Sequence, residues 1–227
     1  MCFSAAASFG AGAVLSLVGA GALMKAQTKS QALFAAIPFI FSAQQMSEGM
    51  LWLAVKNQDI QSWEPFFTYA FLFFALVLWP VYIPYTIWLL EKNIRRKKIL
   101  GILLGLGSAT SVCLLTVLLI YPANVVADHH HIHYSFDLPL VTRNLTGLVS
   151  LFYFIATILS PFISGIKRMK WLGIVFLVSY LFSVIFFSGF LVSVWCYFAA
   201  LLSFVVVWIL WGLRKEPLRG FVVPRQA

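Results

Sequence analysis

The distribution of positive charge is the feature that most constrains this chain. Seven long apolar runs divide the sequence, and lysine and arginine fall almost entirely in alternate gaps and after the last run. Because cytoplasmic loops of membrane proteins retain Lys and Arg, this asymmetry predicts a polytopic membrane protein with its N-terminus outside and its C-terminus cytoplasmic. All basic residues except Lys56 and Arg143 follow the pattern: Lys25, Lys29, Lys92, Arg95, Arg96, Lys97, Lys98, Lys167, Arg168, Lys170, Arg214, Lys215, Arg219 and Arg225.

The apolar runs have the length of membrane-spanning helices, which need about 20 residues. The chain is 62% hydrophobic and only 10% charged, which excludes an ordinary soluble domain. We predict an all-α fold, a single seven-transmembrane-helix bundle over residues 1–213 with a basic cytoplasmic tail at 214–227. The predicted spans are 4–24, 32–55, 65–90, 99–121, 145–166, 170–188 and 190–213, with an outer loop at 122–144.

The net charge of +9 does not indicate nucleic-acid binding. Basic residues at the cytoplasmic ends of helices attract anionic headgroups, so membrane lipids are the expected partners and nucleic acid is not. No basic residue precedes the first run, and Lys25 and Lys29 follow it. We therefore expect this run to remain as a helix rather than to be removed as a signal peptide.

Small residues and prolines predict how the helices pack. The first span carries Gly10, Gly12, Gly19 and Gly21, and the fourth carries a similar set at 101, 105 and 107. Small residues let helix backbones approach closely in lipid. In the third span, Pro80 and Pro84 remove backbone donors, which predicts a bend in its inner half.

The outer loop contains a segment with alternating character. From His131 to Asp137, polar residues alternate with Ile132, Tyr134 and Phe136. A period of two predicts a short strand, which could form a hairpin with 124–127. We expect its apolar side to lie on the mouth of the bundle as a lid.

Glu48 is the acidic residue that lies clearly inside a predicted span. Ionisable residues inside a membrane are costly and are candidates for function. Gln44 lies one helical turn earlier on the same face, and Gln45 adds polarity nearby. Two interpretations remain open: Glu48 holds helices together through a hydrogen bond to glutamine, or it binds a ligand, a proton or a metal.

The four histidines, His129, His130, His131 and His133, lie within five positions of the outer loop. Neutral imidazole is the commonest metal ligand, and residues i and i+2 of a strand share a face. His131 and His133 could therefore chelate from one side, while His130 points toward the bundle. The alternative is a chance cluster in a solvated loop.

Cys2 and Cys196 fall at the same outer end as Glu48 and the histidines in the predicted topology. For Cys2 we consider a packing residue, a disulfide with Cys196, a thiolate ligand, and an amino-terminal nucleophile exposed by removal of Met1. Cys113 lies mid-span and is expected to be an inert packing residue.

Several segments together resemble an uncharacterised family of bacterial polytopic membrane proteins. They are MCFSAAASF, FSAQQMSEGMLWL, FLFFALVLWP, HHHIHYSF and SVWCYFAA. The resemblance implies a multi-pass protein of the bacterial inner (plasma) membrane and no particular activity. It places the family's shared segments on Cys2, Ser4, Gln44, Gln45, Glu48, Trp52, Trp79, Pro80, His130, Tyr134, Trp195 and Cys196, all at the outer end except Trp79 and Pro80.

We expect an outward-facing site that binds a transition metal, Zn or Cu, because Cys, His and carboxylate are its usual ligands. The expected metal ligands are Cys2, Glu48, His130, His131, His133 and Cys196. As a hydrolase of a lipid-like substrate, the protein would use Glu48 and Cys2 as catalytic groups. Gln44, Gln45, Tyr134 and Trp195 are the expected ligand-binding residues. The alternatives are a transporter or small-molecule sensor with a metal-free site at Glu48 and Gln44, and a purely structural protein.

The predicted topology is testable by cysteine labelling in intact cells. With the native cysteines replaced, Asn93→Cys should resist a membrane-impermeant maleimide because the 91–98 connection lies inside. Asn124→Cys, in the outer loop, is the control and should be labelled. Labelling of Asn93→Cys before the cells are lysed would contradict the topology.

Overall fold

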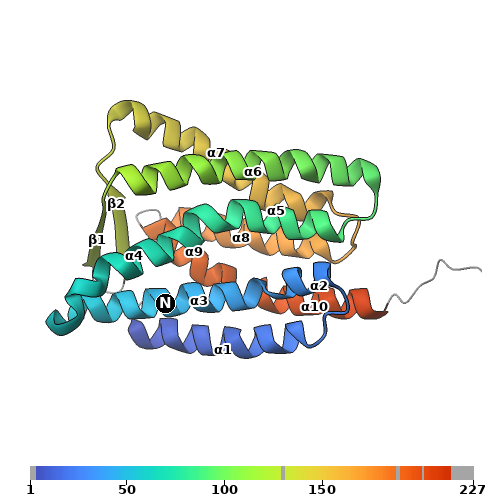
Figure 1. The fold of residues 1–227 in the computed structure, drawn as a ribbon, viewed down its shortest axis with the longest axis horizontal. Helices are drawn as coiled ribbons and strands as arrows, with labels where there is room; N and C mark the ends of the chain where they lie inside the picture. The colour runs from blue at the N-terminus through green and yellow to red at the C-terminus, as the bar shows by residue number, and fades with distance from the viewer. Residues whose placement is uncertain (1–3, 129–130, 188–189, 201, 216–227) are drawn as a thin grey trace, which may run out of the picture.

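The computed structural model describes residues 4–128, 131–187, 190–200 and 202–215. Apart from a two-stranded hairpin, they form helices that run along the long axis of an elongated bundle (Figure 1). The elements are α1 (Ala5–Leu23), α2 (Lys29–Ala35), α3 (Ile37–Lys56), a 3-10 helix (Gln58–Trp63), α4 (Glu64–Leu72), a π-helical segment (Phe73–Leu78), α5 (Trp79–Leu90), α6 (Ile94–Ile120), β1 (Ala123–Asp128), β2 (His131–Phe136), α7 (Leu140–Ile163), α8 (Met169–Phe187), α9 (Leu191–Ala200) and α10 (Leu202–Lys215).

The all-α prediction is confirmed, and four of the described helical segments are long and apolar enough to cross a membrane. They are Ala5–Leu23, Gln58–Leu90, Ile94–Ile120 and Met169–Phe187. The predicted span 32–55 consists of two helices, because α2 and α3 divide at Ala36. Pro38 lies in the first turn of α3, where its missing N–H costs no helical hydrogen bond.

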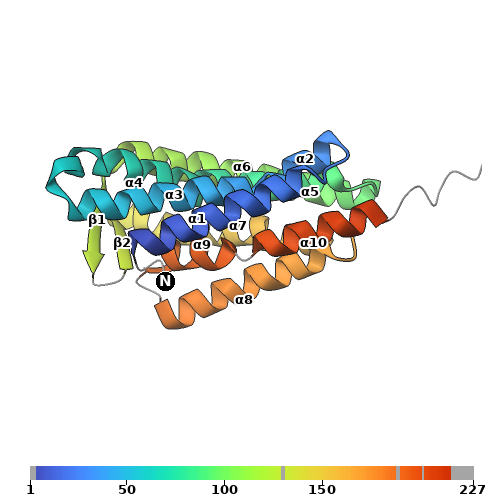
Figure 2. The same ribbon diagram turned by 90° about the horizontal axis from the view of Figure 1, so that it is seen from below.

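The two ends of the bundle differ, because the hairpin lies at one end and most of the basic connections between helices lie at the other. In Figures 1 and 2, the hairpin lies at one end, together with the end of α3 and the end of α6. The connections from α1 to α2, α5 to α6 and α7 to α8 lie at the opposite end, where α10 also finishes. These connections carry Lys25, Lys92 and Lys167, so the charge asymmetry of the sequence becomes an asymmetry of the molecule.

A π-helical segment at Phe73–Leu78 interrupts the third apolar run and ends two residues before Pro80. The sequence predicted a bend in the inner half, so the irregularity lies earlier than expected. Side chains of neighbouring helices satisfy its carbonyls: Tyr153 Oη of α7 donates to Ala75 O at 2.8 Å, and Ser111 Oγ of α6 donates to Val77 O at 2.6 Å. Such partners are necessary where irregular backbone lies inside a bundle without water.

Gly107 provides the closest backbone approach among the described glycines. A Cβ at this position would overlap the carbonyl oxygen of Pro80. That oxygen lacks its usual i+4 donor because residue 84 is also proline, and the glycine lets α6 lie directly against it. Gly105, one half-turn away on α6, faces open space.

The predicted small-residue packing of α1 holds at two of its four glycines. A Cβ at Gly12 would lie 2.9 Å from Met46, and a Cβ at Gly19 would lie 2.6 Å from the Phe39 ring. Both neighbours belong to α3, so this face of α1 is the one that packs. Gly10 and Gly21 have open space beside them.

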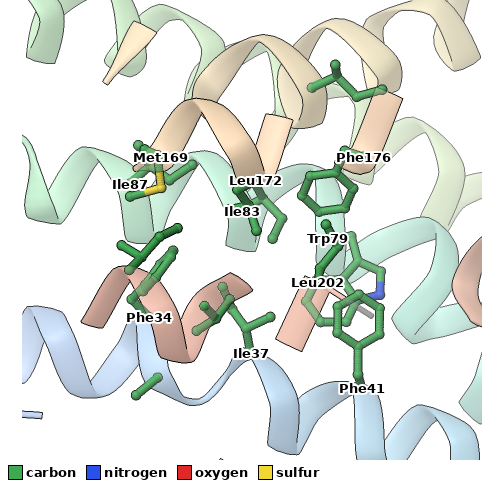
Figure 3. Close-up of a cluster of buried hydrophobic side chains, with 14 of the residues drawn as sticks. Phe34, Ile37, Phe41, Trp79, Ile83, Ile87, Met169, Leu172, Phe176 and Leu202 are labelled. Atoms are coloured by element: carbon green, nitrogen blue, oxygen red, sulfur yellow. The ribbon is translucent and has the colours of Figure 1, made fainter. Parts of the chain in front are cut away.

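The main apolar core contains residues of α1, α2, α3, α5, α6, α7, α8 and α10, and Figure 3 shows the part formed by α2, α3, α5, α8 and α10. Phe41 and Trp79 stack there with ring centroids 4.0 Å apart. Because Trp79 belongs to α5 and Phe41 to α3, this contact joins α3 to α5. The buried side chains labelled in Figure 3 are Phe34, Ile37, Phe41, Trp79, Ile83, Ile87, Met169, Leu172, Phe176 and Leu202.

The predicted hairpin is confirmed. Strands β1 and β2 pair antiparallel, with Val126 opposite His133. Ile132 is fully buried against Leu51 and Trp52 of α3, and Tyr134 stacks on Phe71 with centroids 5.2 Å apart. The apolar side of the hairpin therefore packs on the end of the bundle.

The contact between Gly107 and Pro80 predicts a large difference between two similar substitutions. Gly107→Ala should lower the melting temperature strongly, since overpacking typically costs about 1–3 kcal/mol and this clash involves backbone. Gly105→Ala should have little effect or stabilise α6 by up to about 1 kcal/mol. Thermal unfolding of both variants in detergent makes the comparison, and equal melting temperatures would contradict the close approach.

Candidate functional site

Glu48 lies inside the bundle on α3 and is completely buried. Ser193 Oγ of α9 donates a hydrogen bond to Glu48 Oε1, and Gln45 Nε2 lies 3.4 Å from Glu48 Oε2. Both partners are neutral. The carboxyl group therefore links two helices that are far apart in the sequence, as the helix-joining interpretation of Glu48 expects.

Gln44 and Gln45 are also completely buried. Trp79 Nε1 donates to Gln44 Oε1 at 2.8 Å, so the tryptophan of the apolar core also anchors a polar side chain. The Gln44 side chain also lies near the Cys196 thiol of α9, and Gln44 Nε2 makes no hydrogen bond to any described residue. Glutamine, glutamate, serine and cysteine thus form one polar cluster between α3, α5 and α9.

Several buried atoms at and around this cluster have no hydrogen-bond partner among the described residues. They are Gln44 Nε2, Gln45 Oε1, Trp52 Nε1 and Trp195 Nε1. A buried donor or acceptor left unpaired costs about 1–3 kcal/mol, so such atoms are uncommon and call for an explanation. Three of the four atoms are N–H donors and one, Gln45 Oε1, is an acceptor. Three of them belong to residues of α3.

A cavity of about 120 Å³ adjoins the cluster. Cys196 and Trp195 of α9 line it, together with Tyr153 of α7 and Tyr180 of α8. The Trp195 ring lies edge-on to both tyrosines, with centroids 5.6 and 5.4 Å away. The cavity therefore has aromatic walls with polar edges, and it meets the Gln44 side chain through Cys196.

The structure brings together some of the residues that the sequence predicted and separates others. Gln44, Gln45, Glu48 and Cys196 lie together, and Trp195 lines the adjoining cavity. Tyr134 of the hairpin packs against Phe71 of α4. Cys196 has a free thiol.

The predicted metal ligands are only partly within the described residues. Cys2 and His130 lie outside them, as does the side chain of His131. His133 is half-buried on β2 and lies against the Phe190 ring, with centroids 6.1 Å apart. Within the described part of the chain, no three His, Cys, Asp or Glu side chains form a group that could hold a metal ion.

The roles of Ser193, Tyr153 and Trp79 were not predicted from the sequence. Ser193 precedes Cys196 by three residues, so both lie on one face of α9, and this spacing was a usable signal. Trp79 was assigned away from the outer cluster, yet its indole N–H reaches Gln44. Its distance from Gln44 in the sequence gave no indication of that contact.

Comparison with curated protein sequences finds no match, and comparison with solved structures also finds none. A family model does match, and it covers residues 1–219. This range includes every element of the bundle and the whole polar cluster. The chain therefore belongs to a family of unknown function, DUF6629.

Proposed function

We propose that the chain is a multi-pass protein of the bacterial inner membrane that binds a small polar solute beside Glu48. In this proposal the chain crosses the membrane seven times. Helices α1, α6, α7 and α8 each cross once, and the pairs α2–α3, α4–α5 and α9–α10 each form one crossing. The N-terminus lies outside and the C-terminus in the cytoplasm. Transport or sensing of the solute is the function class that fits such a site.

Cation–aromatic pairs at the basic end support the placement in a membrane. Lys25 Nζ lies 4.2 Å from the centroid of the Trp211 ring, and Lys97 Nζ lies 4.4 Å from that of Trp88. Tryptophan and lysine are favoured at the level of lipid headgroups. These pairs are expected to mark the cytoplasmic interface, with the hairpin at the outer one.

The observation that carries the solute proposal is the set of unpaired buried atoms around Glu48. Gln44 Nε2 and Gln45 Oε1 offer a donor and an acceptor, and Trp195 Nε1 belongs to the wall of the adjoining cavity. Sites that bind small polar molecules combine a few such groups with aromatic walls. A solute or ordered water that bonds these atoms would remove the cost of leaving them unpaired.

The chemistry of the cluster favours a small, neutral, hydrogen-bonding solute. The hydrogen-bond partners of Glu48 are uncharged, and the cavity of about 120 Å³ has room for only a few heavy atoms. Tyr153 Oη is already bonded to Ala75 O, so the tyrosine is held in position as a wall. The hairpin covers the outer end of the same helices through Ile132.

Transition-metal binding, with hydrolysis of a lipid-like substrate, is the weaker interpretation. Among the expected ligands, the described residues bring together only Glu48 and Cys196. A zinc site ordinarily has at least three protein ligands. Zinc or copper binding is therefore an alternative outcome of the experiment and not the proposal.

The test measures stabilisation of purified protein by defined probes. Thermal unfolding in detergent is followed with glycerol, urea or acetamide, and in parallel with Zn²⁺ or Cu²⁺. The proteins are wild type, Glu48→Gln, Gln44→Leu and, as a control outside the cluster, Cys113→Ser. A ligand at 100 times its Kd stabilises by about 2.7 kcal/mol, so a probe that binds raises the melting temperature by several degrees.

We expect one of the neutral probes to stabilise the wild type and Cys113→Ser more than Glu48→Gln and Gln44→Leu. Comparison between variants removes the general effect of co-solvents. Equal responses of all four proteins to every probe would support a purely structural cluster. Stabilisation by Zn²⁺ or Cu²⁺ alone, lost in Glu48→Gln, would support the metal interpretation instead.

A further inference from the structure

A second cavity lies at the basic end of the bundle, opposite the hairpin. Its volume is about 600 Å³, within the range of small-molecule sites. The α5–α6 connection, the α7–α8 connection and α10 form its walls. Three basic residues line it, Lys92, Lys167 and Arg168, and nothing in the proposed solute site uses it.

Glu91 is the acidic residue that lines this cavity, and its carboxylate accepts hydrogen bonds from nearby residues of the protein. Its Oε2 accepts hydrogen bonds from Gly165 N at 2.6 Å and Ser164 Oγ at 3.4 Å, and its Oε1 accepts from Asn93 N at 2.8 Å. Burial by itself would raise the pKa of Glu91, but the hydrogen bonds, led by that from Gly165, bring the pKa below its ordinary value. The carboxylate thereby joins the two connections and fixes the shape of the cavity.

Arg168 is held against α10 on the other side. Its Nη1 donates to Trp208 O at 2.8 Å, and its guanidinium carbon lies 4.7 Å from the centroid of the Trp208 ring. Gly212 makes room for it, since a Cβ there would lie 2.7 Å from Nη1. A guanidinium has five N–H donors, so this one bond positions Arg168 and leaves capacity for the oxygens of an anion.

The remaining wall of the cavity is apolar and includes Leu90, Ile209 and Leu213. The cavity therefore presents cations and hydrocarbon to the same occupant. A free phosphate ion would use only the cations, whereas a phospholipid uses both. The site also lies at the end of the proposed membrane-spanning helices, where lipid headgroups meet the aqueous phase in the proposed topology.

We infer that this cavity binds the headgroup of an anionic phospholipid, with Lys92, Lys167 and Arg168 contacting the phosphate oxygens. The glycerol and the first part of an acyl chain lie along the apolar wall. The inference rests on the proposal that the bundle spans a membrane. It does not depend on the solute site at Glu48.

The experiment titrates phospholipid into delipidated full-length protein in a neutral detergent. Phosphatidylglycerol is the anionic probe, phosphatidylcholine is the zwitterionic control, and affinity is read from tryptophan fluorescence and the melting temperature. The test variant is Lys92→Gln/Lys167→Gln. Lys98→Gln/Lys170→Gln is the matched control, because it removes the same charge from exposed lysines outside the cavity lining.

Phosphatidylglycerol should bind the wild type and the control variant with similar affinity, and phosphatidylcholine should bind much more weakly. The Lys92→Gln/Lys167→Gln variant should lose roughly tenfold or more in affinity for phosphatidylglycerol, since lysines beside the membrane surface attract anionic headgroups. Equal losses in both double variants would overturn the inference and indicate diffuse attraction to the basic end.

Competition separates the lipid from a soluble phosphate. Millimolar glycerol 1-phosphate and inorganic phosphate should not displace phosphatidylglycerol, because neither can use the apolar wall. Displacement by either at these concentrations would overturn the assignment of a lipid occupant. Failure of the membrane topology itself would be seen separately, in the labelling of Asn93→Cys.

Discussion

The structure depends on pairing polar groups inside a bundle that is apolar along most of its length. In such an environment an unpaired amide or carboxyl costs several times what it costs at a protein surface. Glu48 therefore bonds to Ser193 and lies within reach of Gln45, while Gln44 accepts from Trp79. These contacts join α3 to α5 and α9, and the adjoining cavity lies beside them at Cys196.

The same constraint explains the middle of the third apolar run. Two prolines four residues apart remove donors from the backbone of α5, and a π-helical segment directly precedes this helix. The hydroxyl groups of Tyr153 and Ser111 donate hydrogen bonds to the buried carbonyls of Ala75 and Val77 in this segment. Gly107 lets α6 approach the carbonyl of Pro80, which no other residue type would allow. The irregular backbone thus holds Trp79 where it reaches Gln44.

Much of the fold was predictable because its signals are local. Hydropathy located the apolar runs, the period-two pattern located the hairpin, and the one acidic residue clearly inside a predicted span indicated Glu48. The contacts of the cluster were not predictable, since Ser193 and Trp79 are brought to α3 only by tertiary packing. The π-helical segment was also not predictable, because proline predicts a missing donor but not how the backbone adjusts to it. The expected metal site relied on shared topology at one end of the bundle, and it stays a prediction because Cys2, His130 and the side chain of His131 lie outside the described residues.

A double-mutant cycle between Glu48 and Ser193 tests the central claim most directly. Unfolding free energies would be measured for wild type, Glu48→Gln, Ser193→Ala and the double variant in one detergent. Because the two side chains share a buried hydrogen bond, we predict an interaction energy of about 1–3 kcal/mol, with the double variant losing less than the sum of the single losses. Additive losses, with an interaction energy near zero, would contradict the account, because Glu48 would then have no contact with α9.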